Sequence, residues 1–312
     1  MKPNLAIKIG EIKLKNPVMV ASGTFGYAEE FKDFLDFQEL GAIVTKTITL
    51  NARRGNQPPR TCETPAGLLN SIGLENPGLD AFVSGKLTLL KQLGVPIIIS
   101  IASEGKPDEF AKLARRCGEV KEISAIELNI SCPNIRSVKR ESRQSAKLIS
   151  QDPKATYDLV KSVRKVTKKT LITKLSPNVT DIAEIALAAE RAGSDAIALI
   201  NTITAMSIDV KTRMPKIAMV TGGLSGPAIR PIAVRMVWEV YKKVKIPIIG
   251  MGGIMDTSSA LEFFIAGATA ISVGTGNFIN PGASIEIIRG LEKYLRVNKI
   301  NGIKALIGSL KT

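Results

Sequence analysis

The first residues to consider lie in the hexapeptide "NISCPN" (129–134), where Cys132 stands between Ser131 and Pro133. The preceding residues form an apolar run that is typical of a buried strand. The chain of 312 residues has three cysteines and no histidine, so it lacks the side chain that most often transfers protons near neutral pH. Cys132 is therefore either a small apolar residue of the core or a general base, since a modest fall in its pKa would make the thiolate available.

Polar or small residues also end most of the other apolar runs in the chain. They are Ser22, Gly23, Lys46, Thr47, Ser100, Asn129, Lys174, Asn201, Thr202, Gly252, Gly253, Gly274 and Thr275. A lysine at the end of an apolar strand costs free energy unless it finds a partner, although its long stem also lets it reach water. Two lysines, two asparagines and a cysteine on one rim would favour a site over separate surface positions.

The elements that must position these residues follow a regular alternation. Eight short apolar runs, typical of strands buried on both faces, span 17–23, 42–48, 95–102, 124–131, 170–176, 195–202, 246–253 and 269–276. Helical patterns separate most of them, for example at 181–193, 228–244 and 258–267. This alternation predicts an α/β fold, a single (β/α)8 TIM barrel over residues 1–312, with catalysis at the C-terminal ends of the strands. A doubly wound open sheet is the alternative, but its glycine-rich first turn is missing.

Two long connections, 49–80 and 203–227, interrupt this alternation and contain glycine and proline clusters. Connections of this length usually form functional lids or carry small strands of their own. We therefore expect small strand insertions in these two loops.

Glycine-rich stretches end the last two apolar runs, in "MGGI" (251–254) and "VGTGNF" (273–278). In barrels, backbone N–H groups after strands seven and eight commonly bind phosphate, and glycine permits close approach because it has no Cβ. Each stretch alone could be a tight turn, but their positions favour a phosphorylated ligand. The loop "NSIGLENPG" (70–78) offers Asn70 and further amides, and it is equally compatible with a plain turn.

Composition restricts the class of protein. Lysine and arginine number 43 and aspartate and glutamate 28, which gives a formal charge of +15. A lysine-rich solvated surface explains this charge better than nucleic-acid binding, because aromatic residues are only 4% of the chain. Cys62, Cys117 and Cys132 show no paired spacing, which argues against a disulfide framework or a metal site. Without a signal peptide or an apolar run of roughly 18 residues, we expect a cytoplasmic protein that does not bind membranes.

Several motifs, in order along the chain, resemble those of class 1 dihydroorotate dehydrogenases. They are "NISCPN", "KLSPNVTDI", "INT", "DVKTRMP", "TGGLSGPAIRPIAVRMV", "PIIGMGGI" and "VGTGNF". The stretch "GNQPPRTCETPAGLLNSIGLENPG" (55–78) is similar to the class 1B catalytic subunit in particular. The resemblance implies an FMN-containing barrel that oxidises (S)-dihydroorotate to orotate in pyrimidine biosynthesis. It also implies a homodimer, or a heterotetramer with a second subunit that carries FAD and a 2Fe–2S cluster and passes electrons to NAD.

The resemblance also implies a role for individual residues. Cys132 would be the base that removes the C5 proton of the substrate while a hydride passes from C6 to flavin N5. FMN would contact Ser22, Lys46, Thr47, Ser100, Asn129, Lys174, Ile200, Gly226, Gly252, Gly253, Gly274 and Thr275. The substrate would contact Lys46, Asn70, Ser71, Ile72, Gly73, Leu74, Asn129, Asn201 and Thr202. Ser100 stands where family members often have asparagine, and its hydroxyl can still form a hydrogen bond.

One segment departs from the class 1B pattern. After "CPN" that class has a short glycine-rich stretch, whereas residues 135–153 are longer here and contain no glycine. They carry the basic side chains of Lys139, Arg140, Arg143 and Lys147. The segment is compatible with a basic cover over the site and equally with a solvated helical turn.

Three other functions fit part of the pattern. A class 1A enzyme reduces fumarate, but residues 55–78 are less similar to that class. An FMN-dependent tRNA dihydrouridine synthase shares the barrel and a cysteine acid, but adds a helical RNA-binding domain for which little chain follows the eighth run. A protein that keeps FMN without turnover would not need Cys132 and two lysines at the rim.

Overall fold

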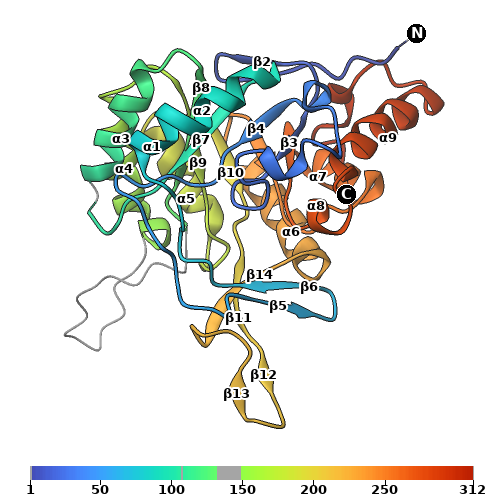
Figure 1. The fold of residues 1–312 in the computed structure, drawn as a ribbon. Helices are drawn as coiled ribbons and strands as arrows, with labels where there is room; N and C mark the ends of the chain where they lie inside the picture. The colour runs from blue at the N-terminus through green and yellow to red at the C-terminus, as the bar shows by residue number, and fades with distance from the viewer. Residues whose placement is uncertain (1, 107, 132–148, 312) are drawn as a thin grey trace.

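The computed structural model describes residues 2–106, 108–131 and 149–311. Its centre is a closed barrel of eight parallel strands, namely β3 (Val18–Val20), β4 (Ala42–Val44), β7 (Ile97–Ile101), β8 (Ile123–Asn129), β9 (Thr170–Lys174), β10 (Ala196–Leu199), β15 (Ile248–Gly250) and β16 (Ala270–Val273). Each barrel strand pairs with the next one along the chain, and β16 pairs with β3 to close the ring (Figure 1). The predicted (β/α)8 barrel is confirmed, with a strand in each of the eight apolar runs.

The paired strands are shorter than the runs that predicted them. The run 195–202 contains β10 only up to Leu199, and the run 42–48 contains β4 only up to Val44. The polar residues that follow leave the regular strand and line a cavity at this end of the barrel. The last residues of these runs therefore belong to the lining of the cavity and not to the paired strands.

Helices cover the outside of the barrel (Figure 1). The main ones are α3 (Asp108–Glu119), α4 (Pro153–Arg164), α5 (Ile182–Arg191), α6 (Arg230–Tyr241), α7 (Thr257–Ala266) and α9 (Ala283–Val297). Shorter pieces are α1 (Leu79–Ala81), a π-helical turn (Phe82–Lys86), α2 (Leu87–Leu90), α8 (Gly276–Ile279) and 3-10 turns at Glu29–Phe31, Phe37–Glu39, Lys91–Leu93, Ile149–Gln151, Pro227–Ile229 and Ile303–Leu306. The three predicted helices correspond to α5, α6 and α7. Over the described part of the chain, no helix combines the length and the apolar character needed to cross a membrane.

Aspartate side chains begin three of the main helices. Asp152 precedes Pro153 at the start of α4, and Asp181 stands at the same position before α5; each carboxylate accepts hydrogen bonds from two backbone N–H groups of the first turn. Asp256 and Ser259 form a reciprocal capping box at α7. Such caps satisfy N–H groups that have no partner inside the helix, and proline suits the first helical position because it has no N–H to satisfy.

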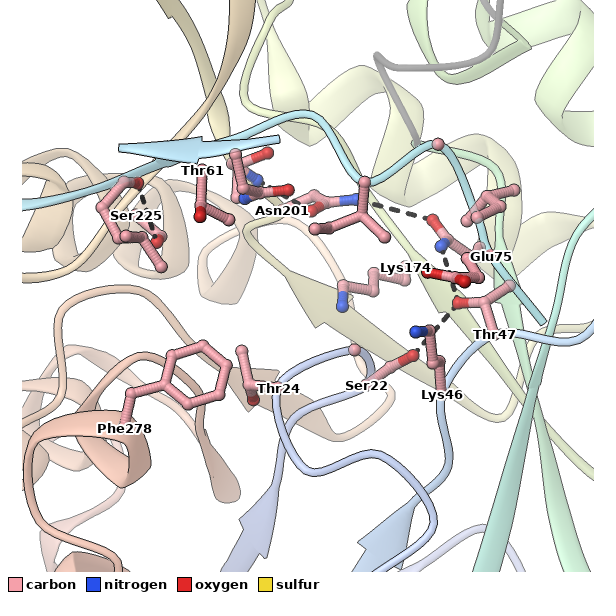
Figure 2. A pocket seen from close by; sticks show the side chains of 18 residues that line it. Ser22, Thr24, Lys46, Thr47, Thr61, Glu75, Lys174, Asn201, Ser225 and Phe278 are labelled. Carbon is pink, nitrogen blue, oxygen red and sulfur yellow. Dashed lines mark hydrogen bonds between the residues drawn. The ribbon is translucent and has the colours of Figure 1, made fainter. Parts of the chain in front are cut away.

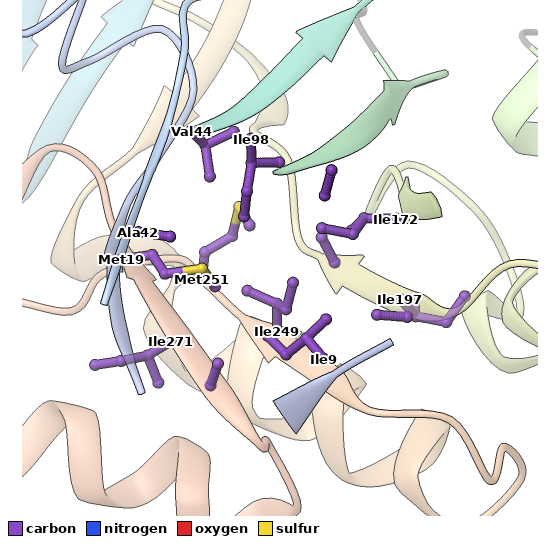
Figure 3. Packing of buried hydrophobic residues seen from close by; sticks show 14 of the residues in the cluster. Ile9, Met19, Ala42, Val44, Ile98, Ile172, Ile197, Ile249, Met251 and Ile271 are labelled. Carbon is purple, nitrogen blue, oxygen red and sulfur yellow. The ribbon is translucent and has the colours of Figure 1, made fainter. Parts of the chain in front are cut away.

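Apolar side chains fill the interior of the barrel (Figure 3). Met19, Ile98, Ile172, Ile249 and Ile271 come from five different strands, and none is more than 2% exposed. Packing of this kind leaves no channel along the barrel axis, so polar chemistry is confined to the ends.

The N-terminal hairpin of β1 (Ile7–Ile9) and β2 (Ile12–Leu14) packs at the end opposite the cavity. The backbone N–H of Glu11, in its turn, donates to the hydroxyl of Thr170, the first residue of β9, at 3.0 Å. Ile9 is fully buried. The hairpin therefore covers the N-terminal end of the barrel.

The two long connections carry strands, as predicted. The loop after β4 contains β5 (Thr61–Thr64) and β6 (Gly67–Asn70), and the loop after β10 contains β11 (Ile203–Met206), β12 (Ile208–Asp209), β13 (Met214–Pro215) and β14 (Thr221–Ser225). Four of these strands join in one antiparallel sheet of order β11-β14-β6-β5, while β12 and β13 form a separate hairpin that projects from the barrel (Figure 1). Pairing of β14 with β6 brings Gly223 opposite Asn70. The insertions therefore meet above the C-terminal ends of the barrel strands.

Candidate active site

A cavity lies between the C-terminal ends of the barrel strands and the inserted sheet (Figure 2). A second, smaller cavity adjoins it. The two share the lining residues Ser22, Thr24, Lys174, Asn201, Thr202 and Ser225. We treat them as two parts of one site.

Most of the residues selected from the sequence line this site. The first part contains Ser22, Gly23, Lys46, Thr47, Asn70, Ile72, Gly73, Leu74, Asn129, Lys174, Asn201 and Thr202. The second part adds Ile200, Gly226, Gly252, Gly253, Gly274 and Thr275. Ser71 and Ser100 are fully buried and line neither part. Cys132 and the basic residues of the segment after it lie outside the described residues.

The Thr47 hydroxyl is the centre of a hydrogen-bond network under the first part of the site. It lies 3.1 Å from the Ser22 hydroxyl and 3.0 Å from that of Ser100, and it accepts from Asn129 Nδ2 at 3.0 Å. Ser100 is connected to the cavity lining by its hydrogen bond to Thr47. A buried hydroxyl with several partners holds them in one arrangement.

A second chain of hydrogen bonds connects the two asparagines. Asn201 Nδ2 donates to the Ser131 hydroxyl at 2.8 Å, and that hydroxyl donates to Asn129 Oδ1 at 3.1 Å. Ser131 is fully buried and is the last described residue before position 132. These bonds hold the Ser131 side chain between the two asparagines.

Two lysine side chains bring positive charge to the cavity, and Figure 2 shows Lys174 and Lys46 extending into it. Lys174 is only 4% exposed. Among the described residues, neither ammonium group has a hydrogen bond or an ion pair. Glu75, the carboxylate that also lines the cavity, is bound to Arg60 at 2.5 Å. Burying an unpaired charge is costly, so an anionic group fits this cavity well.

Glycines leave room for a ligand along the second part and at its edge. A Cβ on Gly274 would meet nothing closer than 3.6 Å, and a Cβ on Gly23 would meet nothing within 4 Å. A side chain at position 23 would therefore project into open space, and a methyl group at position 274 would make only ordinary contacts with Ala21 and Thr24. Gly252 and Gly253 have φ of 126° and 74°, values that favour glycine. A Cβ on Gly252 would lie 2.9 Å from Ala233 and one on Gly253 would lie 2.7 Å from Arg230, so the fold itself requires glycine at both positions, while their backbone lines the second part of the site.

The loop after β6 is held by the segment before β5. The Ile72 carbonyl accepts from the backbone N–H of Asn56 at 2.9 Å, and the Ser71 N–H donates to the Arg60 carbonyl at 2.7 Å. Asn70 Nδ2 donates to the Gly223 carbonyl at 3.2 Å. The predicted substrate loop is therefore ordered by both insertions.

Some lining residues were not foreseen from the sequence. They are Thr24, Thr61, Leu68, Glu75, Ser225 and Phe278 in the first part, and Ala21, Ile229, Met251 and Ile254 in the second. Ser225 accepts a hydrogen bond from Thr275 at 2.7 Å, and its place before Gly226 in "GGLSGP" was a usable signal. Thr61 and Leu68 reach the cavity through the pairing of β5 with β6, which no local pattern shows.

The other two cysteines lie away from the cavity lining. Cys117 on α3 is fully buried, and burial raises the pKa of its thiol to about 12. Cys62 on β5 is partly exposed. Within the described ranges no group of three or more histidine, cysteine, aspartate or glutamate residues could hold a metal ion.

Comparisons with known proteins agree with this arrangement. The sequence profile of the family described as dihydroorotate dehydrogenase matches residues 4–295. A protein of Trichlorobacter lovleyi named dihydroorotate dehydrogenase B (NAD(+)), catalytic subunit, is 50% identical over 311 residues that cover all of both chains. Proteins of the same name are 53% identical in Caldicellulosiruptor bescii, over 98% of this chain and 99% of the other, and 49% identical in Geotalea uraniireducens, over 100% and 99%. The chain therefore belongs to the dihydroorotate dehydrogenase family.

Proposed function

We propose that this chain oxidises dihydroorotate to orotate with FMN as its cofactor, and that it supplies the catalytic subunit of an enzyme that reduces NAD. The observation that carries the proposal is the buried Lys174 ammonium, which has no partner among the described residues and faces the same cavity as Asn70, Asn129 and Asn201. A fixed cation beside amide donors suits an anionic cofactor and a carboxylate substrate.

The residues present fit FMN. The backbone at Gly252–Gly253 and Gly274–Thr275, which lines the second part of the site, would hold the phosphate. Lys174 would lie against the flavin ring and compensate the negative charge that the ring gains on reduction. When bound, the flavin accepts the hydride that leaves the substrate. Ser22, Lys46, Thr47, Asn129, Ile200 and Gly226 would complete its surroundings.

The substrate would occupy the space beneath the loop after β6. Asn70, Asn129, Asn201 and Thr202 supply polar groups for its carboxylate and ring, and the backbone from Ser71 to Leu74 would close over it. Cys132, the residue after Ser131, would accept the proton from substrate C5. A thiol has a reference pKa of about 8.5, and a positive charge beside it would favour the thiolate.

Electrons would leave through a second subunit that carries FAD and a 2Fe–2S cluster. The names of the relatives support this arrangement, because they describe a catalytic subunit of an NAD(+) enzyme. The complete assembly would be a heterotetramer built on a homodimer of this chain, working in the cytoplasm. A fumarate-reducing class 1A enzyme and a tRNA dihydrouridine synthase are the alternative functions.

The test is an anaerobic half-reaction. Purified chain loaded with FMN is mixed with L-dihydroorotate, and the flavin absorbance near about 450 nm is followed. We expect rapid bleaching and the formation of orotate, followed by reoxidation with NAD only when the partner subunit is present. Reoxidation by fumarate alone would favour class 1A. A yellow protein that does not bleach, with or without the partner, would contradict the proposed substrate.

A further inference from the structure

The side chain of Asn178 connects two loops at the rim of the site without lining the cavity. Asn178 follows β9, four positions after Lys174. Its Nδ2 donates to the Ser176 hydroxyl at 3.1 Å within its own loop and to the Thr202 carbonyl at 3.1 Å in the loop after β10. Its Oδ1 accepts from the backbone N–H of Thr204 at 2.9 Å. One amide therefore holds both ends of the segment 202–204.

Strand β14 holds Thr202 from another direction. A Cβ on Gly223 would lie 2.0 Å from Thr202 Oγ1, so Thr202 occupies the space that the missing side chain leaves. The Gly223 carbonyl in turn accepts the hydrogen bond from Asn70 Nδ2. Asn70 and Thr202 both line the cavity. Asn178 thus anchors one end of a chain of contacts that runs through the polar groups assigned to the substrate.

The backbone of Asn178 reaches a third loop. Its carbonyl accepts from Gln151 Nε2 at 2.9 Å, in the 3-10 turn Ile149–Gln151 that precedes α4. Loops after three consecutive barrel strands, β8, β9 and β10, therefore meet at this residue. Lys174 and the glycines of the second part are positioned by other elements, since Lys174 belongs to β9 itself and the glycines Gly252, Gly253 and Gly274 follow β15 and β16.

We propose that Asn178 is a positioning residue for substrate binding, which fixes Thr202 and the adjacent Asn201 without touching the substrate. The inference rests on the proposed function and names a determinant of its substrate affinity. Losing the amide would free the segment 202–204 on one side, so substrate and product should bind more weakly. FMN should bind unchanged, because none of its proposed contacts is bonded to the Asn178 side chain.

Two variants and one control test this role. Asn178→Ala removes all three side-chain hydrogen bonds. Asn178→Asp keeps the size and the acceptor for the Thr204 N–H, but directs a carboxylate oxygen at the Thr202 carbonyl. Thr180→Ala alters an exposed side chain two positions further along the same loop, with no hydrogen bond among the described residues. The measurements are the Kd of orotate, KM and kcat for dihydroorotate, and the FMN content.

We expect the Kd of orotate and the KM to rise about tenfold or more in both Asn178 variants, as the loss of three hydrogen bonds in Asn178→Ala and of two in Asn178→Asp would give. The FMN content and the rate of flavin reduction at saturating substrate should stay within about threefold of the wild type. Values within twofold of the wild type for Kd and KM in both variants would overturn the proposal. A loss of FMN content that accompanies the loss of orotate affinity would also overturn it, because the substitution would then have disrupted the whole rim and not substrate binding alone. If the wild-type protein binds no orotate, the proposed function is contradicted as well.

Discussion

Asn129 donates a hydrogen bond from Nδ2 to Thr47 Oγ1 at 3.0 Å. Asn129 ends β8 and Thr47 follows β4, so this contact connects two strands that are separated in the barrel by β7. Ser100, on the strand between them, bonds to the same Thr47 oxygen, and Ser22 bonds to it from the side of β3. One hydroxyl therefore ties together four neighbouring strands at the rim where the cofactor and the substrate are proposed to bind.

Replacing Thr47 with valine tests the importance of that hydroxyl. Thr47→Val keeps the shape of the side chain but removes the partner of Asn129 Nδ2 and of the Ser100 hydroxyl, both of which are buried. We expect the free energy of unfolding to fall by about 1–3 kcal/mol, because buried polar groups without a partner are costly. Urea unfolding monitored by circular dichroism measures it, with the exposed Thr180→Val as the matched control. Equal stability of the two variants would show that the network is dispensable.

The unpaired Lys174 predicts a specific loss of cofactor affinity. Lys174→Gln removes the charge but keeps a polar side chain of similar length, so FMN should bind at least about tenfold more weakly to the apoprotein. The exposed Lys168→Gln, six positions earlier, changes the net charge equally without touching the cavity. Titration of FMN by flavin fluorescence measures both. An identical Kd for the two variants would remove Lys174 from the flavin site.

Two glycine variants distinguish a glycine that leaves room for a ligand from a glycine that the packing of the fold requires. Gly274→Ala adds a methyl group with no protein atom closer than 3.6 Å, whereas a Cβ on Gly250 would lie 2.5 Å from Phe263. Gly274→Ala should therefore leave the melting temperature of the apoprotein unchanged and weaken FMN binding, while Gly250→Ala should lower the melting temperature. Calorimetry and FMN titration distinguish the two. Unchanged FMN affinity in Gly274→Ala would move the phosphate away from this position.

The barrel and most of the site could be predicted from the sequence because both depend on local patterns. Continuous apolar runs marked all eight strands, and their polar ends marked residues such as Lys174 and Asn201, which parallel strands bring to one rim. Contacts between loops that are distant in the chain have no local sequence pattern that would predict them. Thr61 reaches the cavity only because β5 pairs with β6, and the hydrogen bond between the Ser100 and Thr47 hydroxyls depends on the pairing of neighbouring barrel strands.

Substitution of Cys132 tests the assignment of the base. Cys132→Ala should retain FMN but slow flavin reduction by dihydroorotate by about 10²–10⁴-fold, the usual contribution of a positioned base. Cys62→Ala serves as the control, because Cys62 lies on β5 outside the cavity lining. Stopped-flow absorbance measures both rates. A Cys132→Ala protein that is reduced as fast as the control would show that another group accepts the proton.

The thiols can also be distinguished by their reactivity. Cys117 is fully buried and the pKa of its thiol is raised to about 12, so at pH 8 it stays protonated and covered. In a Cys62→Ser variant, one thiol should therefore react quickly with an alkylating reagent, and peptide mapping should identify it as Cys132. Its rate should rise with pH, because the thiolate is the reacting species. Orotate should protect it. A reaction that orotate does not slow would place Cys132 outside the substrate site, whatever its pKa.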